Sequence, residues 1–221
     1  MVKAIFCDFY GTLVHEFGPI SYEIMNRILK SGTAASLEEV MTYWWPAYSK
    51  RLANANGDSF RLQEEMIHEN FAEVIEQFQS TESAKELTDL MVKHWCNPPI
   101  YEDTKAFLEN LTLPIYFISN SDDFFIDEAL KNLDLHPTSV ITSQQTKHYK
   151  PNQEIFLQAL NRAGLNADET IHIGDSLTGD IESPRSIGIN AIWMNRDNKP
   201  VPEGILAVSD LTEFEKLLTT I

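Results

Sequence analysis

The stretch FCDFYGTLVHE, residues 6–16, decides the fold of this chain. It overlaps the apolar run VKAIFCDF, which carries Asp8 near its end, and then passes through Gly11 into a polar loop. Four further runs share this character: PIYFISN, SVITSQ, TIHIGD and NAIWMN. Short, nearly continuous apolar runs are typical of strands that are covered on both faces, as in a parallel sheet.

Segments with helical periodicity alternate with these strands. They lie at residues 104–111, 124–133, 152–163 and 181–188. This alternation predicts an α/β fold, namely a doubly wound, mainly parallel, Rossmann-like sheet.

A long insert after the first strand breaks the alternation, because only helical patterns occur in it. The sequence SLEE has the form of a capping box and predicts a helix start near Leu37. Pro46 is expected to kink or interrupt that helix. We therefore predict two domains: a Rossmann-like core of residues 1–16 and 98–221, and an α-helical cap domain of residues 17–97.

The composition is that of a globular protein with a strongly acidic surface. The 33 Asp and Glu residues outnumber the 17 Lys and Arg, which gives a formal net charge of −16. Such a surface repels nucleic acid and anionic membranes, so neither is expected as a partner. The chain has no leader pattern and no apolar run of ~18 residues, which favours a cytoplasmic protein. Either a monomer or a homodimer is compatible with the sequence.

Polar residues end the predicted strands or lie in the loops beside them. Because the carboxyl ends of parallel strands meet at one edge, where ligands bind in such sheets, these side chains are expected to converge. They are Asp8, Tyr10, Thr12, Ser119, Asn120, Lys150, Asp175 and Asp180. Carboxylates and an ammonium group at one sheet edge are suited to hold a cation beside an anionic substrate.

The order of four motifs resembles that of the haloacid-dehalogenase-like hydrolase superfamily. The motifs are D-x-x-G-T-L at 8–13, hydrophobic-Ser-Asn at 118–120, Lys-Pro at 150–151 and G-D-S-x-x-x-D at 174–180. The helical insert also stands where that superfamily has an α-helical cap. The resemblance therefore extends over essentially the whole chain.

This resemblance implies a metal-dependent hydrolase of a small phosphorylated metabolite. Asp8 would be the nucleophile that forms an aspartyl-phosphate, and Lys150 would offset the repulsion between the anionic nucleophile and the phosphate. Mg²⁺ would be held by Asp8, the Tyr10 backbone carbonyl, Asp175 and Asp180. The substrate would be bound by Thr12, Ser119 and Asn120.

Tyr10 departs from the phosphatase pattern, in which a second Asp acts as general acid and base at this position. A phenol with a reference pKa of ~10 can donate a proton but is a poor base at neutral pH. His15, with a reference pKa of ~6.5, is a candidate replacement. A substrate with an acidic leaving group would need no such residue.

Tyr10 also keeps a second reaction open, that of a metal-independent L-2-haloacid dehalogenase. A departing halide needs no proton, and D-x-Y-G-T-L with YKP resembles that branch. Asp175 argues against the dehalogenase reaction, because that branch has Ser-Ser-Asn-x-x-Asp in place of the fourth motif, where this chain has G-D-S-x-x-x-D. The cap also lacks that branch's arginine, since Pro46 follows Trp45. The sequence therefore favours the phosphohydrolase.

Two further alternatives remain open from the sequence. A phosphonoacetaldehyde-type reaction would need a Schiff-base lysine in the cap, where Lys30 and Lys50 lie. A catalytically weak binding or regulatory member of the superfamily would explain the loss of the second Asp.

Overall fold

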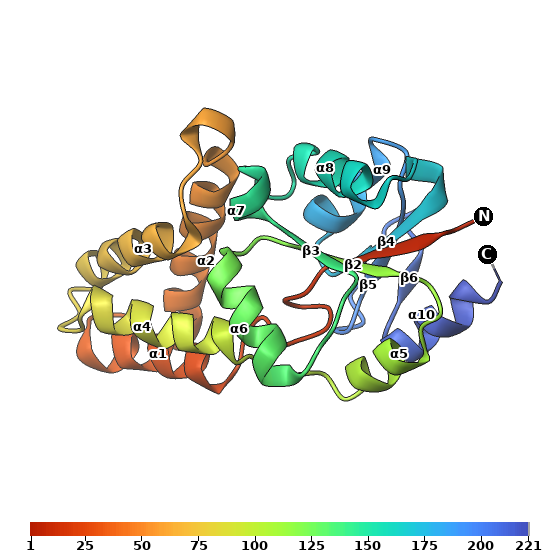
Figure 1. The fold of residues 1–221 in the computed structure, drawn as a ribbon. Coiled ribbons are helices and arrows are strands. Elements are labelled where there is room, and N and C mark those ends of the chain that lie inside the picture. The colour runs from red at the N-terminus through yellow and green to blue at the C-terminus, as the bar shows by residue number, and fades with distance from the viewer. Residues whose placement is uncertain (221) are drawn as a thin grey trace. The chain divides into compact units, whose positions relative to one another are not determined.

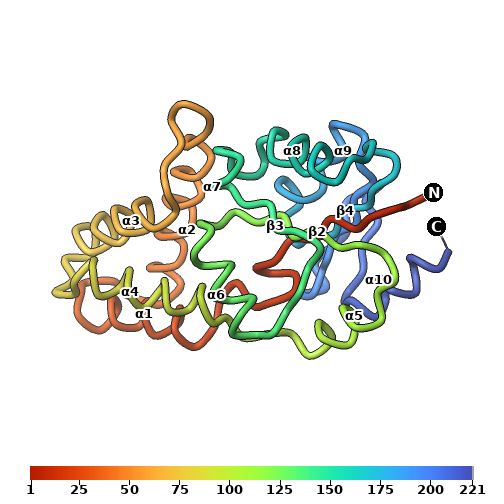
Figure 2. The backbone as a smooth tube through the Cα atoms, in the orientation of Figure 1, coloured from red at the N-terminus to blue at the C-terminus, as the bar shows by residue number. Residues whose placement is uncertain are grey.

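The computed structural model describes residues 1–220, which form two compact units (Figures 1 and 2). The first unit consists of Met1–Glu16, Pro99–Asn120 and the described residues from Asp134 onward. The second consists of Phe17–Pro98 and Ser121–Leu133. No helix within residues 1–220 combines the length and apolarity needed to cross a bilayer.

The first unit is built on a six-stranded parallel sheet in the order β3-β2-β1-β4-β5-β6. The strands are β1 (Ala4–Cys7), β2 (Ile115–Ser119), β3 (Ser139–Thr142), β4 (Thr170–Gly174), β5 (Asn190–Met194) and β6 (Ala207–Val208). The predicted parallel α/β fold is confirmed, and the five predicted strands are present. β6 was not predicted, because two residues carry no periodic signal.

Helices cover both faces of this sheet, as the apolar strands require. In Figure 1, α8 (Glu154–Ala163) and α9 (Ser183–Arg185) lie on one side of it, and α5 (Thr104–Asn110) and α10 (Leu211–Leu218) on the other. Phe156 of α8 and Phe6 of β1 belong to one cluster of buried apolar residues. Short helical turns complete the unit: α7 (Ser143–Thr146), η2 (Ala167–Glu169) and η3 (Leu177–Glu182).

The predicted helix at 181–188 has the wrong bounds. The chain instead forms a π-helical turn, η3, followed by the three residues of α9. The reason is local hydrogen bonding: Gly179 N–H donates to Ser176 Oγ at 3.0 Å, and Ser176 N–H donates to Asp180 Oδ2 at 3.1 Å. These bonds start the turn several residues early and direct Asp180 back toward β4.

The second unit is entirely helical. Its elements are α1 (Pro19–Ser31), α2 (Leu37–Asn54), η1 (Gly57–Ser59), α3 (Gln63–Gln77), α4 (Ala84–Cys96) and α6 (Asp123–Leu133). The predicted start of α2 at Leu37 is confirmed, since Glu39 N–H donates to Ser36 Oγ at 3.1 Å. The helix continues without interruption through Pro46. Trp44 and Tyr48 are buried on α2 and stack with a centroid separation of 6.1 Å.

The segment that contains α6 belongs to the helical unit, whereas the predicted domain boundaries placed it in the core. Two contacts account for the difference. The rings of Phe125 and Trp95 lie 5.2 Å apart, and the Asp122 carboxylate accepts from the backbone N–H groups of Gln63 and Glu64 at 2.8 and 3.0 Å. Asp122 therefore caps α3, a helix almost sixty residues earlier in the chain.

Candidate functional site

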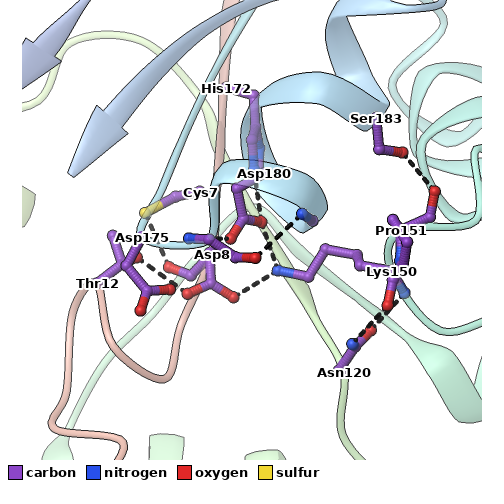
Figure 3. Close-up of polar contacts among 12 residues, drawn as sticks. Cys7, Asp8, Thr12, Asn120, Lys150, Pro151, His172, Asp175, Asp180 and Ser183 are labelled. Atoms are coloured by element: carbon purple, nitrogen blue, oxygen red, sulfur yellow. Dashed lines mark hydrogen bonds and ion pairs between the residues drawn. The ribbon is translucent and has the colours of Figure 1, made fainter. Parts of the chain in front are cut away.

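Polar side chains from four segments of the first unit meet where β1 and β4 end (Figure 3). Asp8 follows β1, and its Oδ2 accepts from Thr12 Oγ1 at 2.9 Å. The Lys150 ammonium lies between two carboxylates, 2.6 Å from Asp8 Oδ1 and 2.6 Å from Asp180 Oδ1. All of these side chains are buried. The predicted convergence of Asp8, Thr12, Lys150 and Asp180 is thus present in the structure.

Two glycines permit the close approach of these carboxylates. Gly11 has a φ of +95°, and a Cβ atom there would lie 2.5 Å from Asp175 Oδ2. A Cβ atom on Gly174 would lie 2.3 Å from Asp180 Cγ. Any side chain at either position would therefore displace a carboxyl group of the site.

Asp180 is held as a buried carboxylate by three donors. Besides Lys150 and the Ser176 N–H, His172 Nε2 lies 3.0 Å from Asp180 Oδ1. Burial alone would raise the pKa of Asp180, but Lys150 and His172 outweigh it and hold that pKa at about 2. Burial lowers the pKa of His172, so the ring is neutral and donates from Nε2.

The remaining acidic groups of the site have raised pKa values. Burial raises the pKa of Asp8 to about 6, against the opposing effect of Lys150. Burial and the negative charge of Asp8 raise the pKa of Glu16 to about 8. Burial, followed by Glu16 and Asp8, raises the pKa of Asp175 well above its usual range. Lys150 thus faces four carboxyl groups, with Lys199 as a further cation near Glu16 and Asp175, and the cluster is short of positive charge.

The oxygen ligands that the site offers fit a hard divalent cation. Carboxylate oxygens of Asp8, Asp175 and Asp180 all lie within 4.8 Å of one another. No hydrogen-bond donor from residues 1–220 reaches the half-buried Asp175 carboxyl group. A cation with oxygen ligands would supply the charge that these three groups lack. Asp175 is best placed to bind it, because hydrogen-bond donors already contact both oxygens of Asp8 and both oxygens of Asp180.

Ser119 and Asn120 end β2 at the same edge of the sheet. Ser119 is buried. The Asn120 carboxamide brackets the backbone of Lys150: its Oδ1 accepts from Lys150 N–H at 2.6 Å, and its Nδ2 donates to the Lys150 carbonyl at 3.1 Å. The Asn120 side chain therefore positions the lysine loop, and substrate binding by the backbone N–H of this residue stays a prediction.

Tyr10 and His15 occupy the loop after β1, but their rings contact other aromatic groups. The Tyr10 ring packs edge-to-face on Phe9, with centroids 4.9 Å apart. The His15 ring stacks on Tyr101 with centroids 3.8 Å apart. Burial and the nearby Arg196 lower the pKa of His15. A role of either residue in proton transfer stays a prediction.

Three residues of this region were not identified from the sequence. Glu16 lies three residues beyond the first motif and within the predicted core, but no role is predicted for it from the sequence. His172 stands two residues before the Gly-Asp pair, and its alternating position in an apolar strand gave no sign that it reaches Asp180. Arg196 follows β5 in a loop without a recognisable motif, yet it binds the backbone of Thr12.

Comparisons with known proteins place this site in a family. The sequence model of the haloacid dehalogenase-like hydrolases matches residues 2–188. The chain is 33% identical over 107 residues to putative HAD-hydrolase YfnB of Bacillus subtilis, which is 47% of this chain and 45% of that protein. The match therefore spans about half the length of this relative. Phosphoserine phosphatase of Thermus thermophilus is 29% identical over 60% of this chain and 56% of its own.

Other matches extend over the whole chain. (S)-2-haloacid dehalogenase 4A of Burkholderia cepacia is 25% identical over 98% of this chain and 95% of its own. The fold is similar to that of the Bacillus subtilis YfnB structure bound to magnesium, with a TM-score of 0.80, 17% identity and 99% of both chains covered. The L-2-haloacid dehalogenase of Xanthobacter autotrophicus gives a TM-score of 0.80 at 15% identity, with 100% of both chains covered.

Proposed function

The chain belongs to the haloacid dehalogenase-like hydrolase family, and within it we propose a metal-dependent hydrolase of a small phosphorylated metabolite. One observation carries this proposal: the Asp175 carboxyl group lies beside those of Asp8 and Asp180, and no hydrogen-bond donor from residues 1–220 contacts it. Adjacent carboxylates repel one another unless a cation lies between them. A metal-independent reaction has no role for the Asp175 carboxylate.

The residues of the site fit two chemical steps. A carboxylate oxygen of Asp8 attacks phosphorus, the bond to the leaving oxygen breaks, and the leaving group takes up a proton. Water then attacks the aspartyl-phosphate and releases inorganic phosphate and free Asp8. Lys150 stabilises negative charge throughout, because its pKa is raised by Asp180 and Asp8 and it stays protonated. Bound Mg²⁺ would add positive charge beside the phosphate.

Tyr10 restricts the substrate class under this proposal. Without a second Asp, a leaving group that departs as a weak base has the advantage, because it needs little proton transfer. Acyl phosphates and aryl phosphates meet this condition, whereas alkyl phosphates do not. We therefore expect a clear preference for activated phosphates.

Metal-independent 2-haloacid dehalogenation is the second candidate, and the comparisons favour it over phosphatase activity. The relative matched over nearly its whole length bears a dehalogenase name, whereas the phosphoserine phosphatase match covers 60% of this chain. Tyr10 fits this reaction as well, since a halide leaves without a proton. Asp8 would then attack carbon and form an ester that water hydrolyses.

A single set of assays separates the two candidates. The purified chain is incubated with acetyl phosphate and p-nitrophenyl phosphate in Mg²⁺ or EDTA, and with L-2-chloropropionate in EDTA. Phosphate release that needs Mg²⁺ supports the proposal, whereas chloride release in EDTA overturns it in favour of the dehalogenase.

Two variants sharpen this result. Asp8→Asn removes the nucleophile and abolishes either reaction. Asp175→Asn removes a carboxylate that only the metal-dependent reaction needs, so it abolishes phosphate release but spares chloride release. If neither product forms, Mg²⁺ titration by calorimetry tests the remaining alternative, a binding member of the family.

A further inference from the structure

The Arg196 side chain, in the loop after β5, makes four hydrogen bonds through its guanidinium group. Its Nη1 and Nη2 donate to the two carboxylate oxygens of Asp103, both at 3.1 Å. Its Nε and Nη2 donate to the Thr12 carbonyl at 3.3 and 2.8 Å. Its flat face lies over the Tyr101 ring, with Cζ 3.7 Å from the centroid. The Arg196 side chain is only 15% exposed, so these contacts are largely screened from water.

Thr12 connects this guanidinium group to the site. The Thr12 hydroxyl donates to Asp8 Oδ2 at 2.9 Å, while the carbonyl of the same residue accepts from Arg196. Thr12 therefore connects Arg196 to one oxygen of the Asp8 carboxylate, whose other oxygen accepts from Lys150. Asp103 in turn accepts from Leu211 N–H at the start of α10, at 2.8 Å, so Arg196 is anchored to a helix that covers the sheet.

The same cluster fixes the end of the loop that leaves β1. His15 stacks on Tyr101, and His15 N–H donates to the Pro99 carbonyl at 2.8 Å. Val14 pairs with Ile100 as an isolated antiparallel bridge. Tyr101 thus has Arg196 and His15 against it, and the chain between Thr12 and His15 is held at both ends.

We propose that Arg196 is a positioning residue, which holds the Thr12 backbone so that the Thr12 hydroxyl orients the Asp8 nucleophile. Only arginine has a planar fork of donors that can bind a carboxylate and a carbonyl together while stacking on an aromatic ring. His15 belongs to the same anchor as a packing group. The inference rests on Asp8 as nucleophile, which both candidate reactions share, and is independent of the choice between them.

Arg196→Lys and Arg196→Ala test this role against Arg185→Ala as a matched control. Arg185 also donates to a backbone carbonyl, that of Gly204, in the same unit. Loss of orientation at Asp8 is expected to lower kcat about 10²-fold in Arg196→Ala with KM within twofold of wild type. Arg196→Lys keeps the charge but not the fork, so it is expected to stay well below wild type. Arg185→Ala is expected to be unchanged.

Two additional readouts distinguish orientation from general damage. Guanidinium ion at millimolar concentration is expected to restore part of the activity of Arg196→Ala but none of Arg196→Lys, whose side chain still fills the site. Hydrogen–deuterium exchange is expected to rise in residues 9–16 of both variants while the strands keep wild-type protection. The exchange experiment gives a result even if wild type turns over none of the test substrates, so failure of the proposed function is recognised separately.

Three results would overturn the inference. One is unchanged kcat and unchanged exchange at residues 9–16 in Arg196→Ala. Another is a rise in KM at constant kcat, which would make Arg196 a substrate-binding residue. The third is faster exchange throughout the sheet in both Arg196 variants, which would make the residue a general contributor to stability.

Discussion

Charged groups are used differently in the two units of this molecule. In the first unit, Lys150 is buried between Asp8 and Asp180, with side chains that are 6%, 6% and 1% exposed. In the helical unit, ion pairs such as Lys85–Asp89 lie at the surface, with side chains that are 76% and 59% exposed. Both sets include pairs at 2.6 Å, so distance alone does not distinguish them.

The difference lies in the cost of removing each charge from water. A buried charge is strongly destabilising once its partner is lost, whereas an exposed charge is rehydrated at little cost. Replacing a buried ion pair with apolar groups of similar volume is often neutral or stabilising, so stability alone gives no reason to bury these charges. A role of these groups in a reaction would explain why they are buried. The following substitutions test the difference between buried and exposed charges.

Lys150→Met is expected to have the largest effect, because it leaves Asp8 and Asp180 buried without their counter-charge. The free energy of unfolding should fall by about 3–5 kcal/mol, and activity should be lost. Urea unfolding followed by circular dichroism measures the first effect. Adding Asp8→Asn to this variant should recover part of the stability; no recovery would mean that lost packing, rather than the unpaired charge, destabilises Lys150→Met.

The charge cluster was largely predictable because its members lie in motifs at strand ends. Asp8 and Thr12 lie in the loop after β1, Lys150 lies in the loop before α8, and Asp180 lies in the turn after β4. Parallel topology brings loops at the carboxyl ends of strands together. His172 and Arg196 were not predictable in this way. His172 reaches Asp180 only because η3 directs that carboxylate back toward β4, and Arg196 reaches Thr12 across the sheet edge from a loop without a motif.

Raised pKa values at the cluster predict an unusual pH dependence when no metal is present. The pKa of Asp8 is about 6 in the folded chain against an ordinary value of 3.8, and that of Glu16 is about 8 against 4.5. The folded state therefore binds more protons than the unfolded state between pH 4 and 8. Stability in EDTA should fall as the pH rises through this range, by at least about 2 kcal/mol.

Thermal unfolding at a series of pH values, in EDTA and in Mg²⁺, measures this effect. Mg²⁺ should reduce the fall, because a cation stabilises the ionised carboxylates that burial disfavours. Asp180 does not contribute in this range: its pKa is about 2, so its stabilising effect is lost only as the pH falls from 3.8 toward 2. A flat profile in EDTA would contradict the description of the cluster as short of positive charge.

Asp122→Ala tests a buried carboxylate in the helical unit. Asp122 is 4% exposed, but its partners are two backbone N–H groups at the start of α3 rather than a charged side chain. Loss of this cap should lower the free energy of unfolding by about 1 kcal/mol. Asp122→Asn keeps one acceptor oxygen and should lose less. Equal losses in urea unfolding would show that the negative charge, rather than the hydrogen bonds, stabilises the helix.

The helical unit shows what sequence patterns cannot reveal. The start of α2 was predicted from SLEE because a capping box involves neighbouring residues only. The cap of α3 by Asp122 joins residues almost sixty positions apart, so no local sequence pattern predicts it. The packing of α6 with α4 through Phe125 and Trp95 has the same long-range origin, so the domain boundary could not be placed from periodicity alone.

Lys85→Met makes the same substitution as Lys150→Met at an exposed ion pair and is expected to have the smallest effect. Water solvates the Asp89 carboxylate once its partner is removed, and salt already screens the pair. The urea midpoint should therefore match that of wild type within the error of the measurement, with or without 0.5 M NaCl. A destabilisation comparable to that of Lys150→Met would mean that loss of any lysine, rather than burial among carboxylates, explains the first result.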